Sequence, residues 1–195
     1  MVNTTSARRR SGVVAVAALI AGLAFSTAAS AERELFFEET ASAFWAVPHE
    51  CADGSTVQGT LLVLSTRDFE SPETEDADPT ARVQFQAVCL DGTSFSWAAP
   101  TAPATITSTE KLKSVRATGS GIARDNLGGT HQVSFDVAWT GFGPLETTVN
   151  GPGSKRQERE ATATGQVTFD GDVLVDGEAN HPTRPAPFIR VDTEK

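Results

Sequence analysis

The chain has 195 residues, with 25 acidic and 16 basic side chains and a formal net charge of −9 at pH 7. It contains two cysteines, three tryptophans, three histidines and no tyrosine. A protein this acidic is repelled by nucleic acid and by anionic membrane surfaces, so neither is expected as a partner.

The first 31 residues have the three parts of a secretory signal peptide. Arg8-Arg9-Arg10 forms a basic start, residues 12–25 form an apolar core, and Ala29-Ser30-Ala31 is a cleavage site of small residues. As a helix the apolar core would cover about 21 Å, which is short of the roughly 30 Å hydrocarbon thickness of a membrane. We therefore expect residues 1–31 to be removed, the protein to be secreted, and the mature chain to contain no membrane span.

Residues 32–195 have the length of one ordinary domain. In an exported chain, where thiols oxidise, an even number of cysteines predicts disulfide bonding. We therefore expect a disulfide between Cys51 and Cys89. No His or carboxylate accompanies the two cysteines at metal-ligand spacing, so neither a metal nor another cofactor is expected.

Apolar and polar residues alternate with period two along most of the mature chain, which is typical of half-buried β-strands. No stretch of the mature chain has apolar residues at the spacing of one helix face over three turns. The alternation is found at residues 57–63, 83–89, 115–121, 132–139 and 161–169, with glycines in apolar positions of 115–121, and a last short strand is expected at 188–191. An all-β fold is predicted.

Turn signals separate these runs. Asp170-Gly171 lies between two apolar runs and predicts a hairpin. Residues 67–80, which are acidic and contain two prolines, are predicted to form a mobile loop, and residues 99–105 a rigid connector. The other Asx-Gly pairs are Asp53-Gly54, Asp91-Gly92, Asn150-Gly151 and Asp176-Gly177.

Successive hairpins favour a meander of about 8–10 strands. The meander could close as a single antiparallel barrel or pack as a two-sheet sandwich, since both have the same alternation of faces. Residues 51–55 (Cys-Ala-Asp-Gly-Ser) also resemble residues 89–93 (Cys-Leu-Asp-Gly-Thr) at a spacing of 38. The resemblance indicates either a duplicated strand–turn unit or simply two cysteines that each end a strand before a turn.

Four residues are weak candidates for ligand contact. Trp45, Trp97 and Trp139 lie on the apolar register of their strands, which favours core packing over stacking on a sugar, although a barrel could place them around a cavity. His131 opens a strand on the inward register and could meet a distant carboxylate at a barrel mouth. No His pair, nucleophile elbow, phosphate loop or dinucleotide fingerprint is present, so no catalytic residue is predicted.

Residues 139–145 (Trp-Thr-Gly-Phe-Gly-Pro-Leu), followed by residues 161–165 (Ala-Thr-Ala-Thr-Gly), resemble a pattern in uncharacterised exported β-proteins of high-GC Gram-positive bacteria. The resemblance covers about residues 112–175. It implies an all-β secreted domain and carries no activity and no functional residues.

These observations favour a secreted, monomeric, non-catalytic module that binds an extracellular ligand or protein. Loops on a rigid β-scaffold often carry such binding, so residues 67–80 are the preferred recognition element. One alternative is an extracellular hydrolase whose triad forms only in the fold. Another is a structural protein associated with the cell envelope. A histidine, a carboxylate and a hydroxyl converging in a cleft would favour the hydrolase, and a continuous apolar cavity would favour the ligand binder.

Overall fold

The computed structural model describes residues 36–69 and 78–194. The expected signal peptide (1–31) and most of the expected loop 67–80 lie outside these residues. The two ends of that predicted loop, residues 67–69 and Thr80, belong to strands. The described residues form ten strands and one short 3₁₀-helix, η1. In chain order they are β1 (Phe36–Glu50), β2 (Thr56–Phe69), β3 (Thr80–Val88), β4 (Ser94–Ser108), η1 (Glu110–Leu112), β5 (Ser114–Asp125), β6 (Thr130–Gly141), β7 (Glu146–Gly151), β8 (Ser154–Phe169), β9 (Asp172–Glu178) and β10 (Phe188–Glu194).

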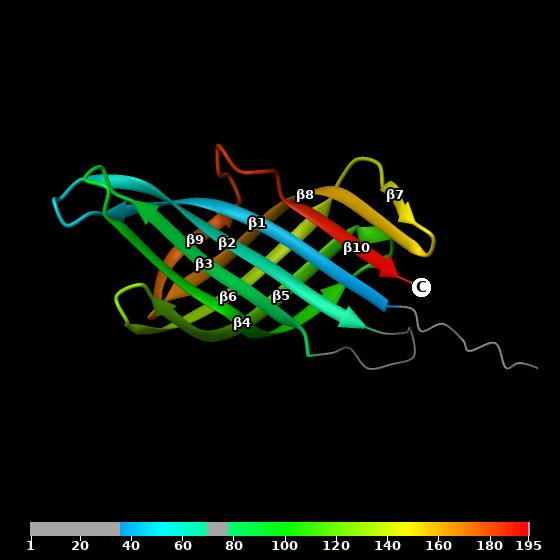
Figure 1. The fold of residues 1–195 in the computed structure, drawn as a ribbon, viewed down its shortest axis with the longest axis horizontal. Helices are drawn as coiled ribbons and strands as arrows, with labels where there is room; N and C mark the ends of the chain where they lie inside the picture. Colours follow the sequence, from blue (N-terminus) through cyan, green and yellow to red (C-terminus); the bar gives the residue numbers. More distant parts are fainter. Residues whose placement is uncertain (1–35, 70–77, 195) are drawn as a thin grey trace, which may run out of the picture. The chain divides into compact units, whose positions relative to one another are not determined.

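Eight of these strands close into an antiparallel barrel (Figure 1). Strands β1 to β6 form a meander, β6 pairs with β8, and β10 pairs with both β8 and β1. Strands β7 and β9 pair with β8 in addition. The expected all-β fold is confirmed. Strand β10 decides between barrel and sandwich. It pairs with β1 on one side and with β8 on the other, so the sheet has no open edge between β1 and β8.

The inward face of the barrel is filled with side chains. Successive residues of a strand point to opposite faces, so every second residue is buried and its neighbours face outward. Thus Val133, Phe135, Val137 and Trp139 are buried, while Ser134 is exposed. The largest members of the core are Trp45, Trp97, Trp139, Phe85, Phe135, Leu61, Ile106, Leu112 and Ile189.

Two local predictions are wrong. Residues 99–105 do not form a connector but lie within β4, where the pairing with β5 shifts register between Ala98 and Ala104. Pro100 and Pro103 lack the N–H that a regular ladder needs, which accounts for the irregularity. Asp176-Gly177 is not a turn either, because both residues lie inside β9 and pair with β8.

The predicted hairpin at Asp170-Gly171 is confirmed. Phe169 pairs with Asp172, and the two residues between them have φ values of 50° and 90°. Positive φ at both central positions is the geometry of a type I′ turn, which matches the twist of the flanking strands. No helix in the described residues is long and apolar enough to cross a membrane.

Candidate functional site

The three tryptophans predicted as weak ligand candidates lie in the core. Trp45, Trp97 and Trp139 are 2%, 3% and 0% exposed. The indole N–H of Trp139 donates to the carbonyl of Ser42 at 2.9 Å, and that of Trp45 donates to the carbonyl of Gly177 at 3.3 Å. These rings support the barrel from within, and none presents an exposed face for stacking.

His131 meets two carboxylates at the end of the barrel that carries the hairpin turns. Its Nε2 lies 2.9 Å from Oδ2 of Asp125, and its Nδ1 lies 2.7 Å from Oδ2 of Asp170. The hydrogen bond to Asp125, followed by that to Asp170, raises the pKa of His131. The hydrogen bond from His131 in turn lowers the pKa of each aspartate. When His131 is protonated, both ring nitrogens donate to these carboxylates, and the ring acts as a clamp between the two aspartates.

This arrangement differs from a catalytic triad. A general base needs one ring nitrogen to accept the proton of a hydroxyl, while the other nitrogen is oriented by a carboxylate. In His131 both nitrogens already bond carboxylates. The ring also stacks on Phe169, with centroids 4.4 Å apart. His131 therefore has the contacts of a structural residue.

Aromatic rings continue from His131 across this end of the barrel. Neighbouring centroids are 4.4 to 6.3 Å apart, which is the range of favourable stacked and tilted ring contacts. The series ends at His49, which stacks on Phe95 at 5.1 Å. Its members are His131, Phe169, Trp97, Phe85, Phe95 and His49. We call these six residues the aromatic layer, because they form a continuous series of ring contacts at this end of the barrel.

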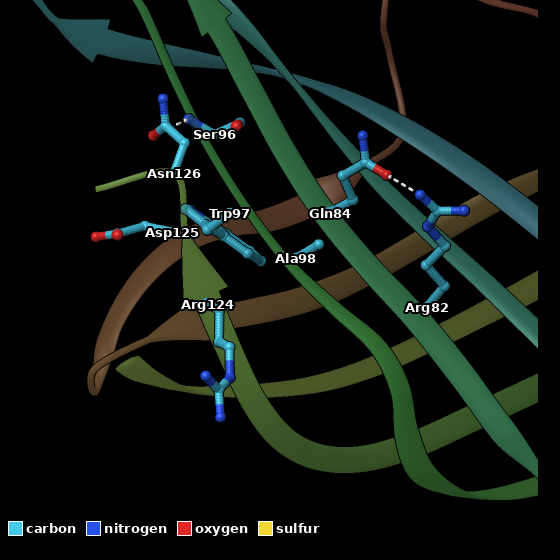
Figure 2. Close-up of a pocket in the computed structure, with 8 residues that line it drawn as sticks. All are labelled: Arg82, Gln84, Ser96, Trp97, Ala98, Arg124, Asp125 and Asn126. Carbon is cyan, nitrogen blue, oxygen red and sulfur yellow. Dashed lines mark hydrogen bonds between the residues drawn. The ribbon is translucent and has the colours of Figure 1, made fainter. Parts of the chain in front are cut away.

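A groove of about 290 Å³ lies on the outer face of β3, β4 and β5, and we call it the β3–β5 groove (Figure 2). Gln84, Ala98 and Arg124 occupy one row across the three strands, because Gln84 pairs with Ala98 and Ala98 with Arg124. The small Ala98 side chain leaves a depression between two long polar side chains. The full lining is Arg82, Gln84, Ser96, Trp97, Ala98, Arg124, Asp125 and Asn126.

Two arginines give the β3–β5 groove its chemistry. Arg82 donates from Nη2 to Oε1 of Gln84 at 2.7 Å, and within residues 36–69 and 78–194 neither Arg82 nor Arg124 forms an ion pair. By contrast, Arg116 and Arg156 on the same barrel are each bonded to an aspartate. Unpaired guanidinium groups bind carboxylate, sulfate or phosphate through parallel N–H donors.

The wall of the groove on β5 is held in place by side-chain hydrogen bonds. Asn126 accepts from the backbone N–H of Ser96 at 3.1 Å and donates from Nδ2 to the carbonyl of Ser94 at 2.9 Å. Asp125 is 8% exposed, and its Oδ1 accepts from two backbone N–H groups while its Oδ2 accepts from His131. Both oxygens of Asp125 are therefore hydrogen-bonded, one inside its own turn and the other to the ring of His131.

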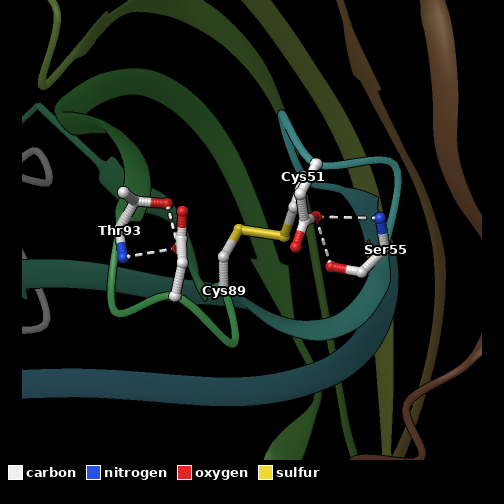
Figure 3. The surroundings of a disulfide bond; sticks show 6 residues. Cys51, Ser55, Cys89 and Thr93 are labelled. Carbon is white, nitrogen blue, oxygen red and sulfur yellow. Dashed lines mark hydrogen bonds between the residues drawn. A yellow bond between two sulfur atoms is a disulfide. The ribbon is translucent and has the colours of Figure 1, made fainter.

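The same end of the barrel carries the predicted disulfide (Figure 3). Cys51 and Cys89 are bonded, with Cα atoms 6.0 Å apart, and join the β1–β2 turn to the β3–β4 turn. The two turns have the same hydrogen bonds: each cysteine N–H donates to the carbonyl of the fifth residue, and each aspartate accepts from the backbone and hydroxyl of Ser55 or Thr93. The sequence echo between residues 51–55 and 89–93 is therefore a repeated turn structure.

No metal centre is indicated. Within the described part of the chain no three His, Cys, Asp or Glu side chains are placed to hold a metal ion, and both cysteines are in the disulfide. His49 belongs to the aromatic layer, and Nε2 of His181 lies 2.9 Å from the hydroxyl of Thr60.

No protein-family model, curated protein or solved structure matches this chain. The resemblance over residues 112–175 stays a prediction.

Sequence reasoning did not find the β3–β5 groove. Arg82 and Arg124 are 42 positions apart, and each looks like an ordinary outward residue of an alternating strand. Only the register of β3, β4 and β5 brings them to one depression. The sequence itself shows only that position 98 is a small residue, Ala98; that it lies between Gln84 and Arg124 follows from the strand pairing.

Proposed function

We propose that this protein is a secreted, non-catalytic binding module that holds a small anionic ligand in the β3–β5 groove. The observation that carries the proposal is the pair Arg82 and Arg124 beside the groove formed at Ala98, neither of which forms an ion pair with another described residue. Gln84, Ser96 and Asn126 add amide and hydroxyl groups that suit an oxygen-rich ligand.

The size and charge of the groove define the class of ligand. A volume of about 290 Å³ is at the lower end for small-molecule sites, so one sugar ring or a molecule of that size fits. A net charge of −9 repels polyanions at long range. The favoured ligand therefore carries a single carboxylate or sulfate on an otherwise neutral, polar body.

An extracellular location is supported by two features. The Cys51–Cys89 disulfide is of a kind that persists in oxidising compartments. The first 31 residues have the pattern of a secretory leader. The geometry of His131 weighs against the hydrolase alternative, because both of its nitrogens bond carboxylates.

The experiment is a titration of isotope-labelled protein with galacturonate, galactose 6-sulfate and uncharged galactose, followed by NMR. We expect the two anionic sugars to shift the backbone amides of Ala98, Arg124 and Asn126, and galactose to leave them in place. Hydrogen bonds to a charged group contribute about 1.5–3 kcal/mol, so Arg82→Gln or Arg124→Gln should weaken binding by about tenfold or more.

Arg184→Gln is the matched control, because it removes the same charge from an exposed residue that does not line the groove. This variant should bind like the wild type. Equal weakening by Arg184→Gln and Arg124→Gln would indicate a general charge effect. Equal shifts from galactose and galacturonate would contradict recognition of an anion.

A further inference from the structure

Strand β7 has one edge without a neighbouring strand in the part of the chain that the structure describes. It pairs with residues 154–158 of β8, and no other strand of the described residues pairs with it. Every β7 residue except Gly151 is exposed. Strand β8 pairs with β6 up to Gly141 and, after residues 142–145, with β7 on the same side. Strand β5, the other neighbour of β6, begins at Ser114, which pairs with Thr140, so its pairing does not extend to β7. The hairpin of β7 and β8 therefore extends beyond β5, the strand that would otherwise cover the edge of β7 (Figure 1).

An exposed edge of this kind offers unpaired backbone groups. Every second residue of an edge strand directs its N–H and C=O away from the sheet, and another extended chain can pair with them. Proteins usually protect such edges with prolines, lysines or bulges turned outward. Thr147 and Thr148 include none of these, and the register shift of β7 lies at its turn end, between Val149 and Gly151. Val149 is 73% exposed.

A second hollow adjoins the start of β7. It has a volume of about 200 Å³ and contains three carboxylates and one exposed ring. Its lining is Phe142, Gly143, Pro144, Glu146, Glu158 and Glu160, and we call it the acidic pocket. Phe142 is 47% exposed.

Two of the carboxylates of the acidic pocket belong to one cross-strand pair. Glu146 lies directly opposite Glu158 in the β7–β8 ladder, and like charges in such a pair are destabilising. None of the three glutamates forms an ion pair with another described residue. Arg190 lies opposite Glu158 in the β8–β10 ladder, and Arg156 interacts with Glu158 at longer range, but both arginines bond Asp192. A cation supplied from outside would relieve this repulsion.

We propose that β7 is a docking edge for an extended, lysine- or arginine-containing segment of a partner protein. The segment adds a strand along the free edge of β7 and places one basic side chain in the acidic pocket, against the ring of Phe142. Backbone pairing supplies the general affinity, and the pocket supplies the preference for a cation. The acidity of the whole chain draws basic segments toward it. This site is separate from the β3–β5 groove.

The test uses the whole protein and three synthetic nine-residue peptides. One alternates lysine with threonine, one has glutamate in place of lysine, and one is the lysine peptide with N-methyl groups on alternate residues. Binding is measured by calorimetry and by NMR shifts of β7 amides. We expect the lysine peptide to bind, the glutamate peptide to bind at least tenfold more weakly, and N-methylation to abolish binding because it removes the edge hydrogen bonds.

Variants locate the site. Glu146→Gln and Glu158→Gln should each weaken the lysine peptide by about fivefold or more, while Glu178→Gln, an exposed glutamate on β9, should not. Arg124→Gln should leave peptide binding unchanged, which keeps this proposal distinct from the anion groove. Absence of binding at millimolar peptide, or equal binding of the N-methylated peptide, overturns it. Sedimentation showing a dimer that occupies the β7 edge would also overturn it, because the occupant would then be a second copy of the chain.

Discussion

His131 Nδ1 lies 2.7 Å from Asp170 Oδ2, and this contact joins the start of β6 to the turn between β8 and β9. Asp170 also accepts the backbone N–H of Gln132 through its other oxygen at 2.8 Å. On the opposite side of the ring, Asp125 ties His131 to the β5–β6 turn. The ring of His131 thus connects two hairpins at the end of the barrel that holds the aromatic layer.

This clamp predicts a pH dependence of stability. The pKa of His131 is raised above its ordinary value of 6.5, so its contribution is complete below about pH 6.5 and is lost as pH rises through the raised value. The pKa values of Asp125 and Asp170 are lowered from 3.8, so their contribution is present above that pH and is lost as pH falls through the lowered values. Stabilisation should therefore be greatest between about pH 4 and 6.5.

The measurement is the melting temperature of the wild type and of His131→Gln from pH 3 to pH 9. The difference between the two proteins should peak in that acidic window and shrink at both ends. Asp170→Asn should retain part of the pH dependence, because the contact with Asp125 remains. Parallel curves for wild type and His131→Gln would show that the clamp is not charged in the folded protein.

A close approach between β2 and β3 predicts a specific steric conflict. A Cβ atom at Gly59 would lie 2.4 Å from Cε2 and Cζ of Phe85, much closer than carbon atoms pack. Gly59→Ala should therefore lower the free energy of unfolding by about 1–3 kcal/mol, as overpacking of a core does. Urea unfolding measures this loss.

Phe85→Leu in the Gly59→Ala background tests the cause. The smaller side chain removes the ring atoms in conflict, so the double variant should lose less stability than the sum of the two single variants, with a coupling of about 0.5 kcal/mol or more. Strict additivity would mean that the methyl group at position 59 destabilises the protein by some other route.

The disulfide predicts a large loss on removal. Cys51 and Cys89 are 38 positions apart, and closing a loop of that length restricts the unfolded chain by about 4 kcal/mol in the chain-entropy treatment. Cys51→Ala with Cys89→Ala should reduce the free energy of unfolding by about that amount in urea. The two turns should keep their NMR signals, because the hydrogen bonds of Asp53 and Asp91 do not involve sulfur. A loss below 1 kcal/mol would show that the unfolded chain is already restricted near this pair.

Much of the local structure could be predicted from the sequence because its causes are local. The alternation along residues 132–139 follows from the two-residue period of a strand, and β6 has that pattern of burial. Asp170-Gly171 predicted its hairpin because few residue pairs tolerate positive φ at both positions. The same Asx-Gly signal was wrong at Asp176-Gly177, where pairing with β8 holds the segment in β9.

The closure of the barrel and both candidate sites depend on contacts that no short segment specifies. Alternation is the same in a sandwich and a barrel, and the pairing of β10 with β1 and β8 joins segments more than 140 and about 30 residues apart. Arg82 and Arg124 flank one groove only because β4 sets their register, and His131 found Asp170 only because β8 follows β6 in the barrel. The sequence by itself determined the all-β class, several of the strands and turns, and the cysteine pair. Tertiary structure alone decided which outward side chains became neighbours, since that depends on strand order and register rather than on local conformational preference.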